Sequence, residues 1–591
     1  MTGIVSVRLR RGQRWPATLV AVLFLSSACQ AAGTGDTTAA SSQQDQTSSG
    51  AEDRQSDDRK RQSNERDRDR TEGPRSDGEV DCPKPGGEGD DARPLDLEDV
   101  TEERGLIEPL VGMFGHAAAT ADVDGNGWLD LYVGTFADKD DKGYQERGAS
   151  GPAPDRLLLG GPDGFTEAPG FKGGTGRSSG AAFADLDADS DLDLVLARNV
   201  KEEEGAAGDD TVVLRNDDGD WSEVAHPATG LGGRGVGVLD YDGDGHLDLF
   251  VTEDRYTGGS SILLRNLGDF EFEEVTEEAG LPDDVHGFGV GAADLTGDGR
   301  PDLFVAGSNR LFVNRDGSFA EVETSAFEIE AYSNEDDITG VAIGDVNRDG
   351  RPDVVLGPHY NSTVDDGCGV PVRLYLHRGM EDGEPVFEDV TESAGLPAFP
   401  TKAPHVEVAD FDNDGWPDLL ASASVAEGER PAVLRHQGLN DQGVPSFAAP
   451  EGAGDDQYWV TGATGDFDRD GQLDVFVVEF DPSLPSLLLR NDNQSKGGWL
   501  EIEVPGDASG VGALVEVYRA GGAGDAEALL LRREVVMGTG YAAGAPPIVH
   551  VGLGDAPRAD IVVRPAWGGE ARELLGVAVG ERVRYPEDFP A

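Results

Sequence analysis

Basic residues are scarce in this sequence of 591 residues. The chain has 48 Lys and Arg against 114 Asp and Glu, which gives a formal net charge of −66 at pH 7. This excess of negative charge opposes binding to nucleic acid or to an anionic membrane surface, and it favours cations or basic ligands. We therefore expect no nucleic-acid partner.

Signatures of common metal-dependent enzymes are missing too. The sequence contains no His-Glu-x-x-His and no paired-cysteine metal motif, and its nine histidines are scattered. His116, His286 and His405 each precede an acidic stretch, where a hydrogen-bonded structural position is a commoner role than catalysis. No residue is predicted to be catalytic.

The sequence has no long apolar run, and a short one lies near its start. Four arginines precede the run Ala17 to Leu25, and "SSAC" follows at 26–29. This layout is typical of a secretory signal, and "SSAC" resembles a bacterial lipobox in which Ser26 replaces the usual Leu. We expect a lipoprotein signal peptide at 1–28 and lipidation of Cys29, with cleavage without lipidation as the alternative. Residues 29–94 are polar and charged without apolar periodicity, which predicts a disordered tether.

Cysteine is limited to three residues. If Cys29 is lipidated, Cys82 and Cys368 remain, and an exported chain tends to oxidise such a pair. Two independent thiols are equally allowed.

The most abundant feature is an acidic nine-residue stretch that occurs seven times, 51 to 65 residues apart. We call these stretches acidic loops 1 to 7. They start at Asp122, Asp185, Asp240, Asp294, Asp345, Asp410 and Asp466. Four short strand patterns accompany each copy, which predicts an all-β, seven-bladed β-propeller over 95–492. An all-β solenoid is the alternative. The strand "LEDVT" at 97–101 precedes the first loop and is expected to complete the last blade.

Oxygen ligands recur at fixed positions of the acidic loops. Positions 1, 3, 5 and 9 carry oxygen-bearing side chains in all seven loops, position 6 is Gly in six, and position 7 offers its backbone carbonyl. Hard oxygen ligands at this spacing suit Ca²⁺, and up to seven ions are expected. Loops 2 and 4 are the least certain, because Ser190 replaces the glycine and Thr296 replaces a carboxylate.

The predicted ligands are, in chain order, Asp122, Asp124, Asn126, Trp128, Asp130, Asp185, Asp187, Asp189, Asp191, Asp193, Asp240, Asp242, Asp244, His246, Asp248, Asp294, Thr296, Asp298, Arg300, Asp302, Asp345, Asn347, Asp349, Arg351, Asp353, Asp410, Asp412, Asp414, Trp416, Asp418, Asp466, Asp468, Asp470, Gln472 and Asp474.

These loops resemble the FG-GAP or VCBS repeats of integrin α propellers, which bind calcium in the same hairpin loops. Residues 493–585 form a second β-rich unit, with "GVGALVEVYR", "LLLRREVVMGTGY" and "VHVGLG". These motifs resemble the ASPIC and UnbV domain. Together the two parts are similar to the cartilage acidic protein 1 family. The resemblance implies an exported calcium-binding protein and is nearly silent on its ligand.

The resulting hypothesis is a calcium-binding scaffold for extracellular recognition or adhesion, lipid-anchored at a bacterial surface. A calcium-dependent polysaccharide lyase or hydrolase is the alternative, and a purely structural envelope protein is the third option. The expected partner is an extracellular protein or glycan, with membrane contact only through the lipid. Aromatic and Arg residues often anchor recognition. On the blade connections opposite the acidic loops, the ligand-face candidates are Tyr144, Arg147, Arg255, Tyr256, Tyr332, His359, Tyr360, Tyr458 and Trp459.

Overall fold

The structure is a computed structural model of the chain. It describes residues 95–199, 210–228, 230–254, 259–329, 337–359, 370–399, 401–425, 430–450, 457–480, 484–493 and 497–590. The described residues all belong to one compact unit of the chain. The expected signal peptide and tether, with Cys29 and Cys82, lie outside the described residues, as does Cys368. Within the described part, no helix has the length and apolar character needed to cross a membrane.

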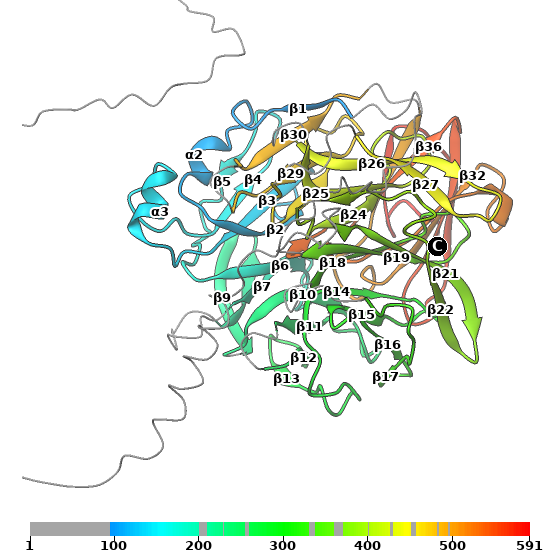
Figure 1. Ribbon diagram of the computed structural model, residues 1–591, viewed down its shortest axis with the longest axis horizontal. Helices are drawn as coiled ribbons and strands as arrows, with labels where there is room; N and C mark the ends of the chain where they lie inside the picture. The colour runs from blue at the N-terminus through cyan, green and yellow to red at the C-terminus, as the bar shows by residue number, and fades with distance from the viewer. Residues whose placement is uncertain are drawn as a thin grey trace, which may run out of the picture. The chain divides into compact units, whose positions relative to one another are not determined.

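Seven sheets with four strands each arise from the repeats in the described part of the chain (Figure 1). The first four sheets, in chain order, are β2 (Gly115–Ala121), β3 (Asp130–Thr135), β4 (Arg156–Leu159), β5 (Thr166–Glu167); β6 (Ser178–Ala184), β7 (Asp193–Arg198), β8 (Thr211–Asp217), β9 (Asp220–Ala228); β10 (Gly233–Leu239), β11 (Asp248–Glu253), β12 (Ile262–Asn266), β13 (Phe272–Glu274); β14 (Gly287–Ala293), β15 (Asp302–Gly307), β16 (Arg310–Asn314), β17 (Phe319–Glu321).

The other three sheets are β18 (Asp337–Gly344), β19 (Asp353–His359), β21 (Arg373–Glu381), β22 (Glu384–Asp389); β24 (Val406–Ala409), β25 (Asp418–Val425), β26 (Arg430–Leu439), β27 (Pro445–Ala448); and β28 (Gly462–Gly465), β29 (Asp474–Val477), β30 (Leu487–Asn491), β1 (Leu97–Asp99). The short strands β20 (Val370–Pro371) and β23 (Ala398–Phe399) pair with each other. Two short helices, α2 (Ile107–Leu110) and α3 (Asp141–Glu146), lie in the first repeat.

The sheets form a closed ring, because apolar side chains fill every gap between consecutive sheets. One cluster packs β2 and β3 against β6 and β7, and equivalent clusters follow around the molecule. The last cluster joins the seventh sheet to the first, through Phe476 and Leu488 with Leu131 and Val133. Strand β1 pairs antiparallel with β30, Leu97 opposite Asn491, so the expected completion of the last sheet by the N-terminal strand is confirmed. The expected all-β propeller is also confirmed.

Buried polar side chains tie neighbouring sheets together near the acidic loops. Asn266, at the end of β12, is fully buried, and its Nδ2 donates to the Leu186 carbonyl of the preceding sheet at 2.9 Å. Asn216, Asn314 and Asn491 each donate in the same way to the loop carbonyl of the preceding sheet. These bonds satisfy carbonyls that would otherwise be buried without a partner.

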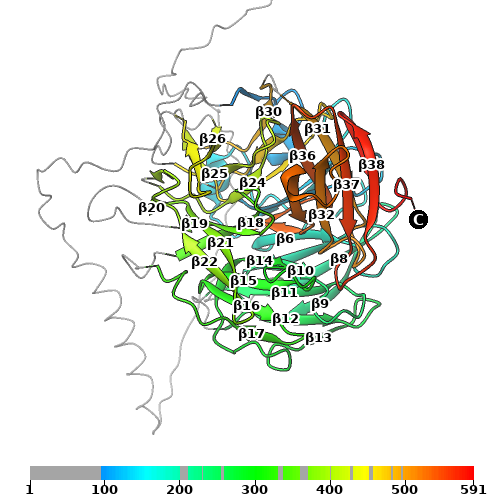
Figure 2. The same ribbon diagram turned by 90° about the vertical axis from the view of Figure 1, so that its right-hand side faces the viewer.

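The C-terminal part forms two packed sheets of its own. Strands β36 (Ile548–Gly554), β31 (Gly498–Glu503) and β39 (Glu581–Arg584) make one sheet; β33 (Leu529–Glu534), β32 (Leu514–Arg519), β37 (Arg558–Arg564) and β38 (Arg572–Ala578) make the other, and a 3-10 helix (Ala526–Ala528) precedes β33. Figure 2 shows strands of both sheets side by side. Apolar residues from both sheets, among them Leu500, Val515 and Val563, form one core.

One segment of the C-terminal part, residues 535–546, runs among the inner strands of the ring. Its strands β34 (Gly538–Thr539) and β35 (Ala543–Gly544) extend the first sheet, with Ala543 beside Ala118 of β2. Gly540 exchanges two backbone hydrogen bonds with Val341 of β18, at 2.9 and 3.0 Å. The Thr461 hydroxyl donates to the Tyr541 carbonyl at 2.6 Å. Because these contacts reach three different sheets, the segment occupies the axis of the ring, and we call it the axial segment.

Gly540 gives a test of how tightly the axial segment packs. Its φ is +59°, and an added Cβ would lie 2.3 Å from His405 Nδ1. Gly521, in the same domain, has φ +82° with nothing within 4 Å of an added Cβ. A left-handed alanine costs about 1–2 kcal/mol at either position, and overpacking adds roughly 1–3 kcal/mol. We predict that Gly540→Ala lowers the melting temperature clearly more than Gly521→Ala. Equal shifts would contradict the axial placement.

Candidate metal sites

Each acidic loop connects the first and second strands of its sheet and is held by the same hydrogen bonds. The position 1 carboxylate accepts the backbone N–H of position 6, as Asp410 does from Gly415 at 2.7 Å. The position 5 side chain accepts the N–H of position 7, as Asp414 does from Trp416 at 2.9 Å. The same pair of bonds occurs in all seven loops. The loops therefore share one backbone turn, which the sequence pattern predicts.

The aspartate at position 9 has a second, structural task. In loop 3, Asp248 Oδ2 accepts the Tyr241 N–H at 3.0 Å, and Oδ1 accepts the Asn266 N–H of the third strand at 2.8 Å. Both bonds have counterparts in the other six loops. The fully buried Asp248 thus joins the loop to the third strand. Each oxygen retains a further lone pair that can face a cation.

Five loops bring three carboxylates together. In each, one oxygen from positions 1, 3 and 9 lies within 4.8 Å of the other two. The groups are Asp122, Asp124, Asp130; Asp185, Asp187, Asp193; Asp240, Asp242, Asp248; Asp410, Asp412, Asp418; and Asp466, Asp468, Asp474. Loop 2 belongs to this set, so Ser190 at position 6 does not prevent its carboxylates from converging. Position 5 is outside these groups.

Burial makes these carboxylates hard to ionise by themselves. Loss of hydration raises the pKa of Asp193 and of Asp248 to about 8, and that of Asp130 to about 7. In loop 6, burial together with the neighbouring carboxylates raises the pKa of Asp410 and Asp418 well above the usual value. A cation among the oxygens would reverse this effect, because opposite charge favours the ionised form.

Arginines from the third strands supply positive charge beside some loops. Arg265 Nη2 lies 2.8 Å from Asp242 and 3.1 Å from Asp244. Arg215 contacts the equivalent pair in loop 2, and Arg435 contacts Asp412 in loop 6. These guanidiniums approach positions 3 and 5, so the loop carboxylates already attract cations.

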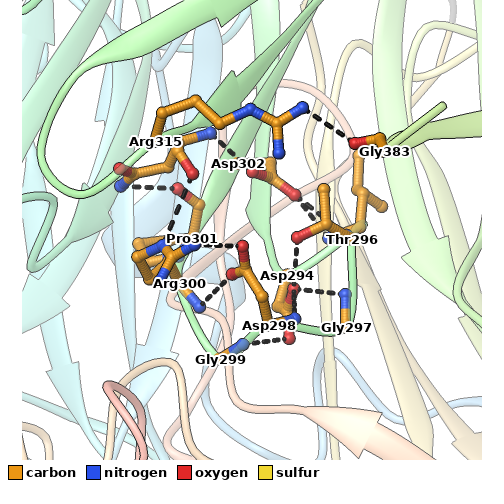
Figure 3. Close-up of polar contacts among 12 residues, drawn as sticks. Asp294, Thr296, Gly297, Asp298, Gly299, Arg300, Pro301, Asp302, Arg315 and Gly383 are labelled. Atoms are coloured by element: carbon orange, nitrogen blue, oxygen red, sulfur yellow. Dashed lines mark hydrogen bonds and ion pairs between the residues drawn. The ribbon is translucent and has the colours of Figure 1, made fainter.

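Loops 4 and 5 differ from the other five. In loop 4 the Thr296 hydroxyl donates to Asp294 Oδ1 at 3.3 Å, and Arg300 pairs with Asp298 (Figure 3). In loop 5, Asn347 Nδ2 donates to Asp349 at 3.0 Å. Neither loop gathers three carboxylates among the described residues. Loops 4 and 5 are therefore poorer carboxylate groups than the other five, which the sequence indicated for loop 4 but not for loop 5.

The C-terminal domain covers the loop face of the ring, which the sequence did not predict. Trp567 Nε1 donates to the Asp240 carbonyl at 2.9 Å, and its backbone N–H donates to Gly299 at 2.7 Å. Glu534 accepts the Asp294 N–H at 2.6 Å. Because these bonds reach the backbones of loops 3 and 4, docking of the C-terminal domain depends on the loop conformation. Single residues such as Trp567 carry no sequence signal for such a role.

Further contacts reach loop 7 and the turn of loop 6. Arg582 of β39 lies 2.5 Å from Asp466, which is position 1 of loop 7. His550 Nε2 lies 2.8 Å from Asn413 Oδ1. Arg582 of the C-terminal domain therefore forms an ion pair with one of the five carboxylate groups.

Several ligand-face candidates are not available at the surface. Tyr144 and Trp459 are each 1% exposed, Tyr144 against Phe114 and Trp459 with Nε1 donating to Pro485. The expectation that they form a recognition surface is wrong, because both pack beneath loops. Arg147 is also nearly buried and pairs with Glu479.

The other candidates divide into two groups. His359 and Tyr458 keep some exposed surface, and burial with the nearby Lys402 charge lowers the pKa of His359 to about 3. The remaining candidates lie outside the described residues: Arg255, Tyr256, Tyr332 and Tyr360.

A Gly-x-Ser-x-Gly pentapeptide, a motif that surrounds the catalytic serine in many hydrolases, occurs at 176–180. Catalytic serines of this motif sit on an exposed turn between a strand and a helix. Ser178 is instead fully buried at the start of β6, and its hydroxyl donates to Asp155 at 2.8 Å. The surroundings of Ser178 are therefore structural.

Comparisons with known proteins agree with this architecture. Residues 240–305 and 306–356 match the FG-GAP-like repeat, and residues 504–584 match the ASPIC and UnbV family. Cartilage acidic protein 1 of Homo sapiens is 27% identical over 454 residues, which cover 70% of this chain and 64% of that protein. Integrin alpha-6 of Gallus gallus is 26% identical over 186 residues, 28% of this chain and 16% of that protein.

A crystal structure of BBS1N in complex with ARL6DN, soaked with mercury, aligns with a TM-score of 0.38 and 10% identity, over 68% of this chain and 98% of that chain. The match to human cartilage acidic protein 1 spans slightly less than two thirds of the length of that protein. This chain carries FG-GAP-like repeats and an ASPIC and UnbV domain, and it is similar to cartilage acidic protein 1.

Proposed function

We propose that this protein is an exported, calcium-binding propeller scaffold for extracellular recognition or adhesion at the cell surface. The observation that carries the calcium proposal is the convergence of three carboxylates in five loops of identical turn geometry. FG-GAP-like repeats and the similarity to integrin alpha-6 support a recognition scaffold.

The loop residues suit a hard divalent cation. Positions 1, 3 and 9 present carboxylate oxygens, position 5 adds an oxygen side chain, and position 7 adds a backbone carbonyl. Calcium accepts six to eight oxygens in flexible geometry, whereas Mg²⁺ demands a strict octahedron. A bound calcium ion would neutralise two charges per loop and keep the turn closed. Its stabilising effect would extend to the C-terminal domain, because Trp567 and Glu534 bind the loop backbone.

Calcium removal tests the metal sites. A ligand that binds only the folded state, at a hundredfold excess over its dissociation constant, stabilises by about 2.7 kcal/mol per site. We predict that EDTA lowers the melting temperature sharply and that Ca²⁺ restores it better than Mg²⁺. Asp414→Ala should reduce the calcium-dependent shift more than Thr296→Ala, because loop 6 gathers three carboxylates and loop 4 does not. If EDTA is shown to remove all metal from the protein and the melting curve does not change, stabilisation by calcium is refuted.

Surface attachment is proposed to run through lipid on Cys29. Two acyl chains give stable membrane anchoring, whereas one chain is marginal. We predict that the natural chain partitions into the detergent phase of a Triton X-114 extract and that Cys29→Ala partitions into the aqueous phase. The same distribution for both proteins would exclude a lipid at this cysteine.

Recognition is tested by ligand binding in both metal states. The mature chain is applied to arrays of extracellular matrix proteins and of glycans, with calcium and then with EDTA. We predict specific binding that EDTA abolishes and added calcium restores. The reason is that calcium keeps the acidic loops closed, and the loops in turn keep the sheets and the C-terminal domain in place. Binding that is unchanged by EDTA, or no binding to either class, would argue against a calcium-dependent recognition scaffold.

A further inference from the structure

A cavity of about 610 Å³ lies between the ring of sheets and the C-terminal domain. Its volume falls within the roughly 300–1,000 Å³ of small-molecule sites. Inner strands β24 and β28 line one side, through Glu407 and Thr464, and β31, β33 and β39 line the other. The exposed residues Gly125, Arg584 and Asp588 also line it, so the cavity opens to solvent beside acidic loop 1.

Arg533 of β33 brings an uncompensated charge to this cavity. Within the described part of the chain, its side chain has no hydrogen bond and no ion pair within 4.0 Å. Arg533 is half-buried between the two domains. Loss of hydration there lowers its pKa, an effect that the nearby Glu407 opposes, and the guanidinium stays charged because arginine keeps its proton in proteins. A half-buried guanidinium without a hydrogen-bond partner among the described residues can form charge-assisted hydrogen bonds with an anion from solution.

The nearest carboxylates are already committed to other groups. Glu407 Oε1 lies 2.9 Å from His405 Nε2, and Oε2 accepts the Thr464 hydroxyl. Glu501 Oε2 lies 2.8 Å from Arg582 Nε. Among the described residues, no carboxylate forms with Arg533 the forked pair that a guanidinium prefers.

The remaining charges define what kind of anion suits the cavity. Six carboxylates and four arginines line it among the described residues. Asp122 and Asp466 belong to the carboxylate groups of loops 1 and 7, so four carboxylates and four arginines remain when calcium occupies those loops. The four remaining carboxylates repel a doubly charged phosphate more than a singly charged carboxylate. The carboxylates on the walls accept hydrogen bonds, so hydroxyl groups on the ligand would find partners there.

We propose that this cavity binds a small hydroxylated carboxylic acid, such as a sugar acid, with the ligand carboxylate on Arg533. The two N–H groups at one edge of the guanidinium donate to the two carboxylate oxygens. The hydroxyl groups of the ligand donate to wall carboxylates such as Glu501 and Glu503. This inference goes beyond the calcium proposal, and its contact residues Arg533, Glu501 and Glu503 lie outside the carboxylate groups of the loops.

Isothermal titration of the full chain in saturating calcium tests the proposal with galacturonate, glucuronate and gluconate as probes. We expect saturable binding of at least one acid. Galacturonate methyl ester and galactose should bind at least about tenfold more weakly, because each lacks the charged carboxylate. Failure of all three acids to bind, or equal binding of the ester, would overturn the proposal.

Substitutions of Arg533 test whether this residue binds the ligand carboxylate. Arg533→Met should weaken acid binding at least about tenfold, and Arg533→Lys should also weaken it, because lysine lacks the forked geometry. Arg519→Met, an exposed arginine of the same domain that pairs with Asp555, should leave binding unchanged. Arg533→Met should melt at a similar temperature, since Arg533 makes no hydrogen bond or ion pair among the described residues that the substitution would remove. Unchanged affinity in both Arg533 variants would refute the site, whatever the calcium experiments show.

Discussion

The buried aspartate at position 9 of each acidic loop is the constraint on which the ring depends. In each sheet this one carboxylate holds both the turn between the first two strands and the backbone of the third strand, as Asp248 does with Tyr241 and Asn266. Burial makes its ionised form costly, and burial also strengthens its bonds to the backbone. The fold thus places a carboxyl group inside every sheet, and a cation at the loop would favour its ionised form.

Much of the ring was predictable from the sequence because its signals are local and repeated. An acidic loop every 51 to 65 residues sets the order of strands around it. The extra strand before the first loop and the missing strand after the last unit predict that the N-terminal strand completes the last sheet, and the structure adds the register, Leu97 opposite Asn491. The convergence of positions 1, 3 and 9 follows from the same spacing. The asparagines at 216, 266, 314 and 491 recur at the end of the third strand, and this pattern could have shown their role earlier.

The C-terminal domain could not be placed from the sequence, because its contacts are single and distant. Trp567 reaches a carbonyl 327 residues away, and no periodicity marks such a pair. One signal was present: inner strands such as "GHAAATA" of β2 contain almost only small residues. Small side chains leave room for a second backbone, here the axial segment. Tyr144 and Trp459 show the opposite error, since an aromatic residue in a connection is as suited to packing beneath that connection as to binding a ligand.

The axial segment also constrains the order in which the molecule can be built. Its residues are held by β2, by Val341 and by Thr461, which belong to the first, fifth and seventh sheets. Contacts between such distant parts of a chain form slowly, since the entropy of closing long loops is lost before they stabilise anything. Residues 535–546 follow all seven sheets in the chain, so they are synthesised after the ring. The newly made protein therefore passes through a ring with an empty axis, whose small-residue inner strands lack their contacts with the axial segment until that segment is made.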